Sequence, residues 1–317
     1  MPTVRRRPTS TCKRRTLSVA RSAGSLRRAR LKCKALGGRA DQQVVTDRKI
    51  LSPEEFWRKY DDIESRLTAP LSERMLDLAG VGPGMRVLDL ATGRGEPALR
   101  AARRVAPDGL VVGVELDDGV LAIAREKARQ SGMSNLDLRS ADAAVSHDVP
   151  SNFFHVVTVR WGLMYMSAPI AALVNAHKAL LPTGVLVAAL WAEPDRVPYY
   201  TLPRRLLERY RVLPGIDPEA PGPFHYADPE RITRDFAAAG LSLDHVEEME
   251  VTVFEAETEA EIVDWVRALG LTRLLNELSE DNQRAWELDL GGELRRMGAG
   301  GLLRLGGSTR IVRARRT

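Results

Sequence analysis

Short apolar runs alternate with longer amphipathic ones between residues 86 and 192. Period and composition are typical of strands in the runs "RVLDL" (86–90), "LVVGVEL" (110–116), "FFHVVTVR" (153–160) and "GVLVAALWA" (184–192). "NLDLRSAD" (135–142) is a weaker candidate for a further strand. Strands this apolar, separated by helices, predict a mostly parallel sheet that is buried between helical layers.

Capping residues mark the helices between these runs. Ser52, followed by Pro53 and Glu55, has the pattern of a capping box and predicts that the folded region begins near residue 50. Glycine endings and helical periodicity predict helices over "LSERMLDLAG" (71–80), "DGVLAIAREKARQSG" (118–132, capped by Asp117 or Asp118) and "APIAALVNAHKALLPTG" (168–184).

The pattern is looser after Trp191. A Pro- and aromatic-rich segment precedes a predicted helix at 229–240 and a predicted strand at 241–254. Helical periodicity follows from residue 257 to about residue 296, and "STRIVRAR" (308–315) is predicted to be a strand.

The net charge of +5 hides an uneven distribution of charge. Residues 1–40 contain 13 Lys and Arg and no acid, which leaves 34 basic and 42 acidic residues, a net charge of −8, in the rest of the chain. Such a body is a poor surface for phosphates, so a nucleic-acid partner is not expected. The Arg- and Ser/Thr-rich segment 1–45 has the composition of an organelle transit peptide. A disordered basic tail, or a misassigned start codon, would give the same composition.

Cysteine usage and hydropathy exclude several classes of protein. Cys12 and Cys33 both lie in the basic tail, so the folded body has no cysteine for a zinc site, a disulfide or a nucleophile, and no metal is predicted. No signal-peptide apolar region is present, and the longest apolar run is too short to span a bilayer. We therefore expect a cytoplasmic protein, or a mitochondrial or plastid one if residues 1–40 are a transit peptide. The sequence does not specify the oligomeric state.

A glycine turn follows the first predicted strand. Residues 93–98, "GRGEPA", match the loose dinucleotide pattern G-x-G-x-x-G/A, which keeps an NAD-dependent oxidoreductase as an alternative. A pyrophosphate, however, needs free N–H groups and no nearby negative charge. Asp89 and Glu96 flank this turn, and Pro97 removes an N–H donor. These acids favour a ligand with a cationic head, such as S-adenosylmethionine.

Two further acids follow the next two predicted strands. Glu115 lies twenty residues after Gly95, where a carboxylate can accept both ribose hydroxyls. Asp142 can accept the adenine amino group, with Ala143 against the ring. Open α/β sheets bind their ligands at the carboxyl ends of the strands, so three acids at three successive strand ends predict one site.

The segments "VLDLATGRGEPAL", "VVGVELDDGVLAIAREKA", "RSADAA", "HKALLPTGVLVAALW" and "FAAAGL" resemble class I S-adenosylmethionine-dependent methyltransferases of the ubiquinone/menaquinone C-methyltransferase type. The resemblance implies a Rossmann-like, seven-stranded, mostly parallel sheet with helices on both faces, a helical insertion on the substrate side and a final antiparallel strand. It also implies a methyltransferase domain over 50–317, with a cofactor-binding core at 75–193 and substrate-side elements at 194–317. The implied cofactor residues are Asp89, Ala91, Thr92, Gly93, Gly95, Glu115, Leu116, Asp142, Ala143 and Arg160.

The expected partner is a small organic acceptor, methylated at oxygen, nitrogen or carbon. His225, next to Tyr226 in a loop expected over the strand ends, is the candidate base, although an isolated histidine in a Pro-rich loop is also typical of a surface residue. Because no other base stands out, a scaffold that binds S-adenosylmethionine without catalysis stays an alternative. The predicted substrate pocket consists of Tyr60, Trp161, Tyr165, Trp191 and Tyr226.

Overall fold

The computed structural model describes residues 51–145, 149–297 and 301–317. The predicted basic tail at 1–45, with Cys12 and Cys33, lies outside the described residues. The chain divides into two units, Met1–Val44 and Val45–Thr317, and every described helix and strand belongs to the second.

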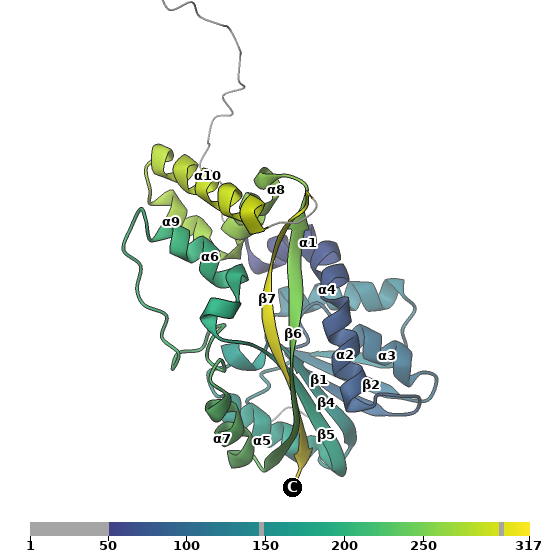
Figure 1. The fold of residues 1–317 in the computed structure, drawn as a ribbon. Helices are drawn as coiled ribbons and strands as arrows, with labels where there is room; N and C mark the ends of the chain where they lie inside the picture. Colours follow the sequence, from purple (N-terminus) through teal and green to yellow (C-terminus); the bar gives the residue numbers. More distant parts are fainter. Residues whose placement is uncertain (1–50, 146–148, 298–300) are drawn as a thin grey trace, which may run out of the picture. The chain divides into compact units, whose positions relative to one another are not determined.

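A seven-stranded sheet forms the centre of this second unit (Figure 1). The strands lie in the spatial order β3 (Leu136–Ser140), β2 (Leu110–Glu115), β1 (Arg86–Leu90), β4 (Phe154–Arg160), β5 (Leu180–Trp191), β7 (Leu303–Arg316) and β6 (Leu241–Ala256). Neighbours from β3 to β5 pair in parallel, and β7 is antiparallel to both β5 and β6. The predicted Rossmann-like sheet with an antiparallel final strand is confirmed.

Helices cover both faces of the sheet. The helices of the described residues are α1 (Pro53–Leu67), α2 (Ala69–Ala79), α3 (Ala98–Val105), α4 (Asp118–Gln130), α5 (Pro169–Ala179), α6 (Pro198–Leu207), α7 (Pro229–Ala238), α8 (Glu259–Val266), α9 (Thr272–Asn276) and α10 (Glu280–Met297), with short turns η1 (Leu163–Tyr165), η2 (Pro194–Arg196) and η3 (Arg267–Leu271). Val87 packs beneath α2 and α3, whereas Leu88 belongs to the larger core beneath α5, α6 and α7. Successive residues of a strand point to opposite faces of the sheet. A strand with apolar residues on both faces, such as β1 with Val87 and Leu88, is therefore buried on both faces.

The predicted caps are present. Ser52 Oγ accepts the N–H of Glu55 at 3.1 Å, and Glu55 Oε2 accepts the N–H of Ser52 at 2.9 Å, which completes the capping box of α1. The side chain of Asp117 caps α4 through the N–H of Val120 at 3.1 Å. Gly80, with φ of 67°, ends α2.

The helix predicted over 168–184 is too long. It ends at Ala179, and residues 180–184 already belong to β5. Pro182 has no N–H to donate to a helix, and its ring disfavours the helical conformation of the residue before it. Extended backbone from Leu180 onward follows, and Leu180 pairs with Phe154 of β4.

A helical insertion, α8 to α10, separates β6 from β7 and gathers at one end of their long hairpin (Figure 1). Helix α1 contacts the insertion and the hairpin through aromatic rings. The ring centroid of Phe56 lies 5.0 Å from that of Trp265 in α8, and Trp265 stacks on Phe254 of β6 with 4.3 Å between centroids. The N-terminal helix and the insertion therefore form one apolar cluster.

Within the ranges that the structure describes, none of the helices combines the length and the apolar composition that a membrane span requires.

Candidate functional site

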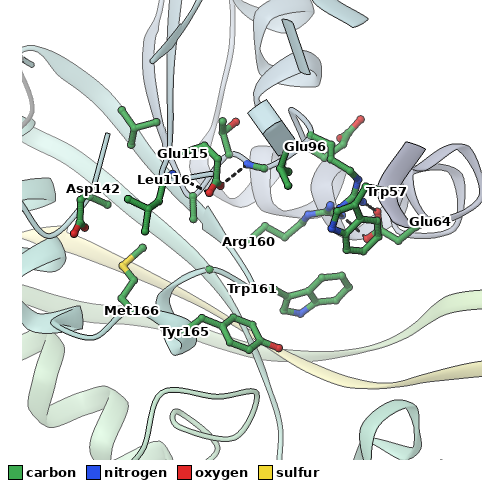
Figure 2. Close-up of a pocket in the computed structure, with 18 of the residues that line it drawn as sticks. Trp57, Glu64, Glu96, Glu115, Leu116, Asp142, Arg160, Trp161, Tyr165 and Met166 are labelled. Carbon is green, nitrogen blue, oxygen red and sulfur yellow. Dashed lines mark hydrogen bonds and ion pairs between the residues drawn. The ribbon is translucent and has the colours of Figure 1, made fainter. Parts of the chain in front are cut away.

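A cavity of about 560 Å³ opens at the carboxyl ends of the parallel strands (Figure 2). Its wall follows the edge of the sheet: Asp142 comes after β3, Glu115 ends β2, Gly93 follows β1, Arg160 and Trp161 end and follow β4, and Trp191 ends β5. The wall thus has an acidic half at β2 and β3 and an aromatic half at β4 and β5, with the glycine turn between them. This edge is where open α/β sheets bind ligands.

The two glycines of the turn have different surroundings. Gly93 has φ of 54°, lines the cavity, and has no atom within 4 Å of the position that a Cβ would take. Gly95 has φ of 96°, but a Cβ there would lie 2.6 Å from Leu99 Cδ1 and 3.3 Å from Ala124 Cβ. Gly93 therefore leaves space for a ligand, whereas Gly95 allows α3 and α4 to pack closely behind the turn.

Glu115 connects the turn to the end of β2. Its Oε2 accepts the N–H of Gly93 at 2.9 Å, and its Oε1 accepts the N–H groups of Leu116 and Asp117 at 2.8 and 3.0 Å (Figure 2). A carboxylate has about four acceptor positions, so these bonds hold the side chain at the cavity wall and leave capacity for a ligand hydroxyl.

Asp142 and Ala143 form the far end of the acidic half. Asp142 Oδ1 accepts the N–H of Ala144 at 2.8 Å, which fixes the loop after β3. The carbonyl of Ala143 accepts Asn175 Nδ2 of α5 at 3.2 Å. Leu116 and Met166 supply apolar wall in the same cavity, so a flat ring and a hydrogen-bonding amino group would both find partners here.

Asp89 corrects the argument from the acids of the turn. Its carboxyl group is fully buried, accepts the hydroxyls of Thr92 and Thr158 at 2.6 Å each, and is not part of the cavity wall. Burial raises the pKa of Asp89 to about 6, against the lowering effect of the two threonine hydroxyls and of Arg160. Asp89 therefore ties the turn to β4, and the negative charge at the wall comes from other acids, including Glu96 and Glu115.

Asp89→Asn is expected to change the pH dependence of stability. The folded-state pKa of about 6 exceeds the usual value of 3.8, so the protonated carboxyl group is favoured by folding. Its contribution is complete below pH 3.8 and is lost as the pH rises through 6. The free energy of unfolding of the wild type, relative to the variant, should fall by about 2 kcal/mol between pH 4 and pH 7 in denaturant titrations. A difference that does not vary with pH would contradict the assignment.

A cluster of two arginines and two acids lies over the turn; we call Arg94, Arg160, Asp61 and Glu64 the α1 cluster. Arg94 Nε donates to Asp61 Oδ1 at 2.6 Å, Arg94 Nη2 pairs with Glu64, and the guanidinium lies 3.5 Å from the ring centroid of Trp57. Arg160 Nη1 donates to Thr68 Oγ1 at 2.6 Å. Burial alone would raise the pKa of Asp61, but Lys127 and Arg94 outweigh it and hold that pKa below 3.8.

The aromatic half presents flat rings. Trp161 stacks on Trp191 at 4.4 Å between centroids, and Trp191 lies 6.0 Å from Tyr199. The hydroxyls of Tyr165 and Tyr200 are 2.8 Å apart. Burial raises the pKa values of Tyr165, Tyr199 and Tyr200 above 10, so these phenols stay neutral at pH 7.

Comparison with known proteins identifies the core. A model of the methyltransferase domain family matches residues 82–203, the segment that carries the glycine turn, Glu115, Asp142 and Arg160. Residues 82–203 form a class I methyltransferase domain. Domains of this class use S-adenosylmethionine as the methyl donor.

The methyltransferase domain has relatives of known name. The chain is 27% identical over 179 residues to the ubiquinone/menaquinone biosynthesis C-methyltransferase UbiE of Shewanella baltica. The matched region covers 56% of this chain and 64% of that protein. The chain therefore spans less than two thirds of the length of this relative.

Solved structures share the fold. The YcgJ protein of Bacillus subtilis matches with a TM-score of 0.53 and 16% identity over 78% of this chain and 98% of its own. The [4+2]-cyclase SpnF matches with a TM-score of 0.50 and 19% identity over 83% of this chain and 95% of its own. At these identities the matches support the architecture of the methyltransferase domain and say nothing of the acceptor.

The donor set of the methyltransferase domain suits S-adenosylmethionine better than a dinucleotide. Glu96 lies at the wall just before α3, where a pyrophosphate would meet the helix, and Pro97 offers no N–H. Gly93 provides the open approach that a backbone-bound ligand needs, and Glu115 and Asp142 offer acceptors for hydroxyl and amino groups. These features do not support the NAD-dependent alternative.

Most of the predicted site residues meet at this cavity. Those on its wall are Ala91, Thr92, Gly93, Glu115, Leu116, Asp142, Ala143, Arg160, Trp161, Tyr165 and Trp191. Asp89 and Gly95 lie behind the wall. Tyr60 packs into the aromatic cluster of α1, and Tyr226 is buried with its hydroxyl donated to Asp235 at 3.2 Å. The structure does not bring Tyr60 or Tyr226 to the cavity.

The predicted base is also elsewhere. The ring of His225 lies 3.3 Å from Arg231 Nη1 and packs edge-on against Tyr226, outside the cavity wall. His155, in β4, has a structural role, since its Nδ1 accepts the N–H of Arg86 at 3.0 Å.

Several wall residues were not predicted from the sequence, among them Glu64, Arg94 and Val253. Glu64 follows Trp57 by seven residues on α1, a spacing that places both on one helix face, so this signal was available. Arg94 stands between the two glycines, at a position where the pattern G-x-G-x-x-G/A accepts any residue, so the pattern carried no signal for its side chain. Val253 of β6 carried no signal, because its position depends on the long hairpin.

Proposed function

We propose that this protein transfers a methyl group from S-adenosylmethionine to a small, flat organic acceptor. The observation that carries the proposal is the division of one cavity into an acidic half and an aromatic half, with the glycine turn between them. In this proposal residues 50–317 act as the catalytic unit, with cofactor binding in 75–193 and acceptor binding helped by elements of 194–317. A cavity of about 560 Å³ in an acidic body suits a small molecule rather than a nucleic acid.

The proposed contacts follow the order of the strands. Asp142 would accept the adenine amino group, Glu115 a ribose hydroxyl, and Gly93 would leave room for the methionyl part. Arg160 and Trp161 would then lie where the cofactor half meets the acceptor half. This order lets the acidic half hold the cofactor while the aromatic rings remain available to the acceptor.

The main contribution of the chain would be alignment. S-adenosylmethionine supplies a methyl group already activated on a sulfonium. Trp161, Trp191 and Tyr200 would hold a flat acceptor against the turn and exclude water, and fixed orientation lowers such barriers by roughly 7–11 kcal/mol. Tyr165 and Tyr200 remain neutral at pH 7, so they would donate hydrogen bonds rather than take a proton. An acceptor atom that is nucleophilic by itself suits this wall best.

The test uses the full chain with methyl-labelled S-adenosylmethionine and a panel of hydroquinones, phenols, amines and aliphatic alcohols. We expect S-adenosylhomocysteine and a labelled product with flat aromatic members and none with aliphatic alcohols, measured by intact-mass spectrometry. Tight binding of S-adenosylhomocysteine without transfer to any member would favour the non-catalytic scaffold. Binding of NADH with no affinity for S-adenosylhomocysteine would overturn the proposal.

A further inference from the structure

Glu64 lies in the cavity wall, but none of the contacts proposed for the cofactor involves it. Glu64 is only 3% exposed, yet it lines the cavity beside the glycine turn (Figure 2). It belongs to α1, which lies outside the matched methyltransferase domain. Its Oε2 pairs with Arg94 Nη2, and its Oε1 lies 3.5 Å from Arg160 Nη2 and 3.3 Å from Thr68 Oγ1. One carboxylate from a peripheral helix thus lies between two guanidiniums of the core.

The two arginines have capacity for another anion. Arg160 makes one close hydrogen bond in the described part of the chain, to Thr68, and its contact with Glu64 is longer than a good hydrogen bond. Arg94 uses Nε and Nη2 for Asp61 and Glu64. A guanidinium has five N–H donors in a fixed fork that matches a carboxylate, so both arginines could bind a second one.

A second carboxylate at this place would compete with Glu64. Arg94 already holds two carboxylates, Asp61 and Glu64, so a third negative group there would meet strong repulsion in a buried site. Asp61, which also accepts from Lys127 Nζ at 2.9 Å, is negative as well and adds to this repulsion. The structure shows Glu64 on the arginines, and a ligand carboxylate at the same place would require a second arrangement, with Glu64 displaced.

We propose that Arg94 and Arg160 bind the carboxylate of the methionyl part of the cofactor, and that Glu64 occupies their place until that carboxylate displaces it. The inference rests on the proposed function, because S-adenosylmethionine is the ligand that carries the carboxylate. It adds that cofactor binding is coupled to α1: the ligand must loosen Glu64, while Trp57 keeps its contact with the Arg94 guanidinium.

The test compares Glu64→Gln with the wild type by calorimetry. The ligands are S-adenosylhomocysteine, its decarboxylated analogue, which keeps the amino group, and 5′-methylthioadenosine, which has neither group. We expect Glu64→Gln to bind S-adenosylhomocysteine on the order of tenfold more tightly, with the other two ligands within about twofold of the wild type. Asp62→Asn is the matched control, since it makes the same charge change at an exposed position of the same helix and should alter none of the affinities.

Two outcomes would overturn the inference. Weaker binding of both S-adenosylhomocysteine and its decarboxylated analogue to Glu64→Gln would show that Glu64 holds the ligand amino group. Unchanged affinities would show that Glu64 is only structural. If Glu64→Gln does not fold, Arg160→Lys replaces it: the loss of the fork should weaken S-adenosylhomocysteine about tenfold and leave 5′-methylthioadenosine unchanged, and equal effects on both would refute the role of Arg160.

The failure of the proposed function has a different signature. A wild-type chain that binds none of the three adenosine ligands would remove the cofactor itself. A wild type that binds all three, with Glu64→Gln behaving like Asp62→Asn, would leave the cofactor in place and remove only the role of Glu64.

Discussion

Glu115→Ala is expected to lower the affinity for S-adenosylhomocysteine by about a hundredfold. Oε2 has one acceptor position left, so the proposed role of this carboxylate is to accept a ribose hydroxyl, and a hydrogen bond to a charged group contributes about 1.5–3 kcal/mol. The substitution also releases the N–H of Gly93, which Glu115 Oε2 accepts at 2.9 Å. Calorimetry on the full chain measures the loss, with far-ultraviolet circular dichroism as a check of folding.

A matched comparison separates the two effects of Glu115. Glu115→Gln keeps one carbonyl oxygen and the shape of the side chain, so we expect a loss of about tenfold. An analogue of S-adenosylhomocysteine that lacks the ribose 2′-hydroxyl should bind less tightly than the parent to the wild type, but equally to Glu115→Ala. If Glu115→Ala keeps the wild-type preference for the 2′-hydroxyl, Glu115 does not bind the ribose.

Gly93→Asn should lower the affinity roughly ten- to a hundredfold with little change in stability. Asparagine tolerates the positive φ of 54° at this position, and no protein atom lies within 4 Å of its Cβ. The new side chain would instead occupy space proposed for the ligand, and overfilling a packed site costs about 1–3 kcal/mol. Calorimetry and thermal unfolding of the same samples give the two values.

Gly95→Ala is the matched control for this turn. Its Cβ would lie 2.6 Å from Leu99 Cδ1, so the cost falls on the packing of α3 against the turn. We expect it to reduce the free energy of unfolding by about 1–3 kcal/mol and to change ligand affinity less than Gly93→Asn does. Equal affinities for Gly93→Asn and the wild type would mean that the ligand does not approach this turn.

The alternation of apolar runs and capped helices was sufficient to predict the sheet, because strands buried on both faces leave a strong signal in the sequence. The strand-end rule located Glu115 and Asp142 at one edge for the same reason. The strand-end rule did not determine the direction in which a side chain points. Asp89 stands two residues after Val87, so its side chain points to the same face of the sheet, into the layer beneath α2 and α3 rather than toward the cavity.

Contacts between distant segments were outside the reach of local patterns. Glu64 meets Arg94 only because α1 docks over the turn, and that docking depends on Trp265 and Phe254, far along the chain. His225 lies in a Pro-rich segment without helical or strand periodicity, so the sequence does not predict where this segment runs. Its position against Arg231 rather than at the cavity is a tertiary result.

The order of the strands in the sheet has a consequence for the growing chain. β7 is the last strand in the sequence, yet it lies between β5 and β6, so the edge of β5 has no partner and β6 has no neighbour until β7 has been synthesised. The aromatic half depends on this step, because Trp161 donates its N–H to Thr309 of β7 at 3.2 Å. The core that holds the glycine turn can form early on the ribosome, whereas the aromatic half is completed only after β7 has been synthesised.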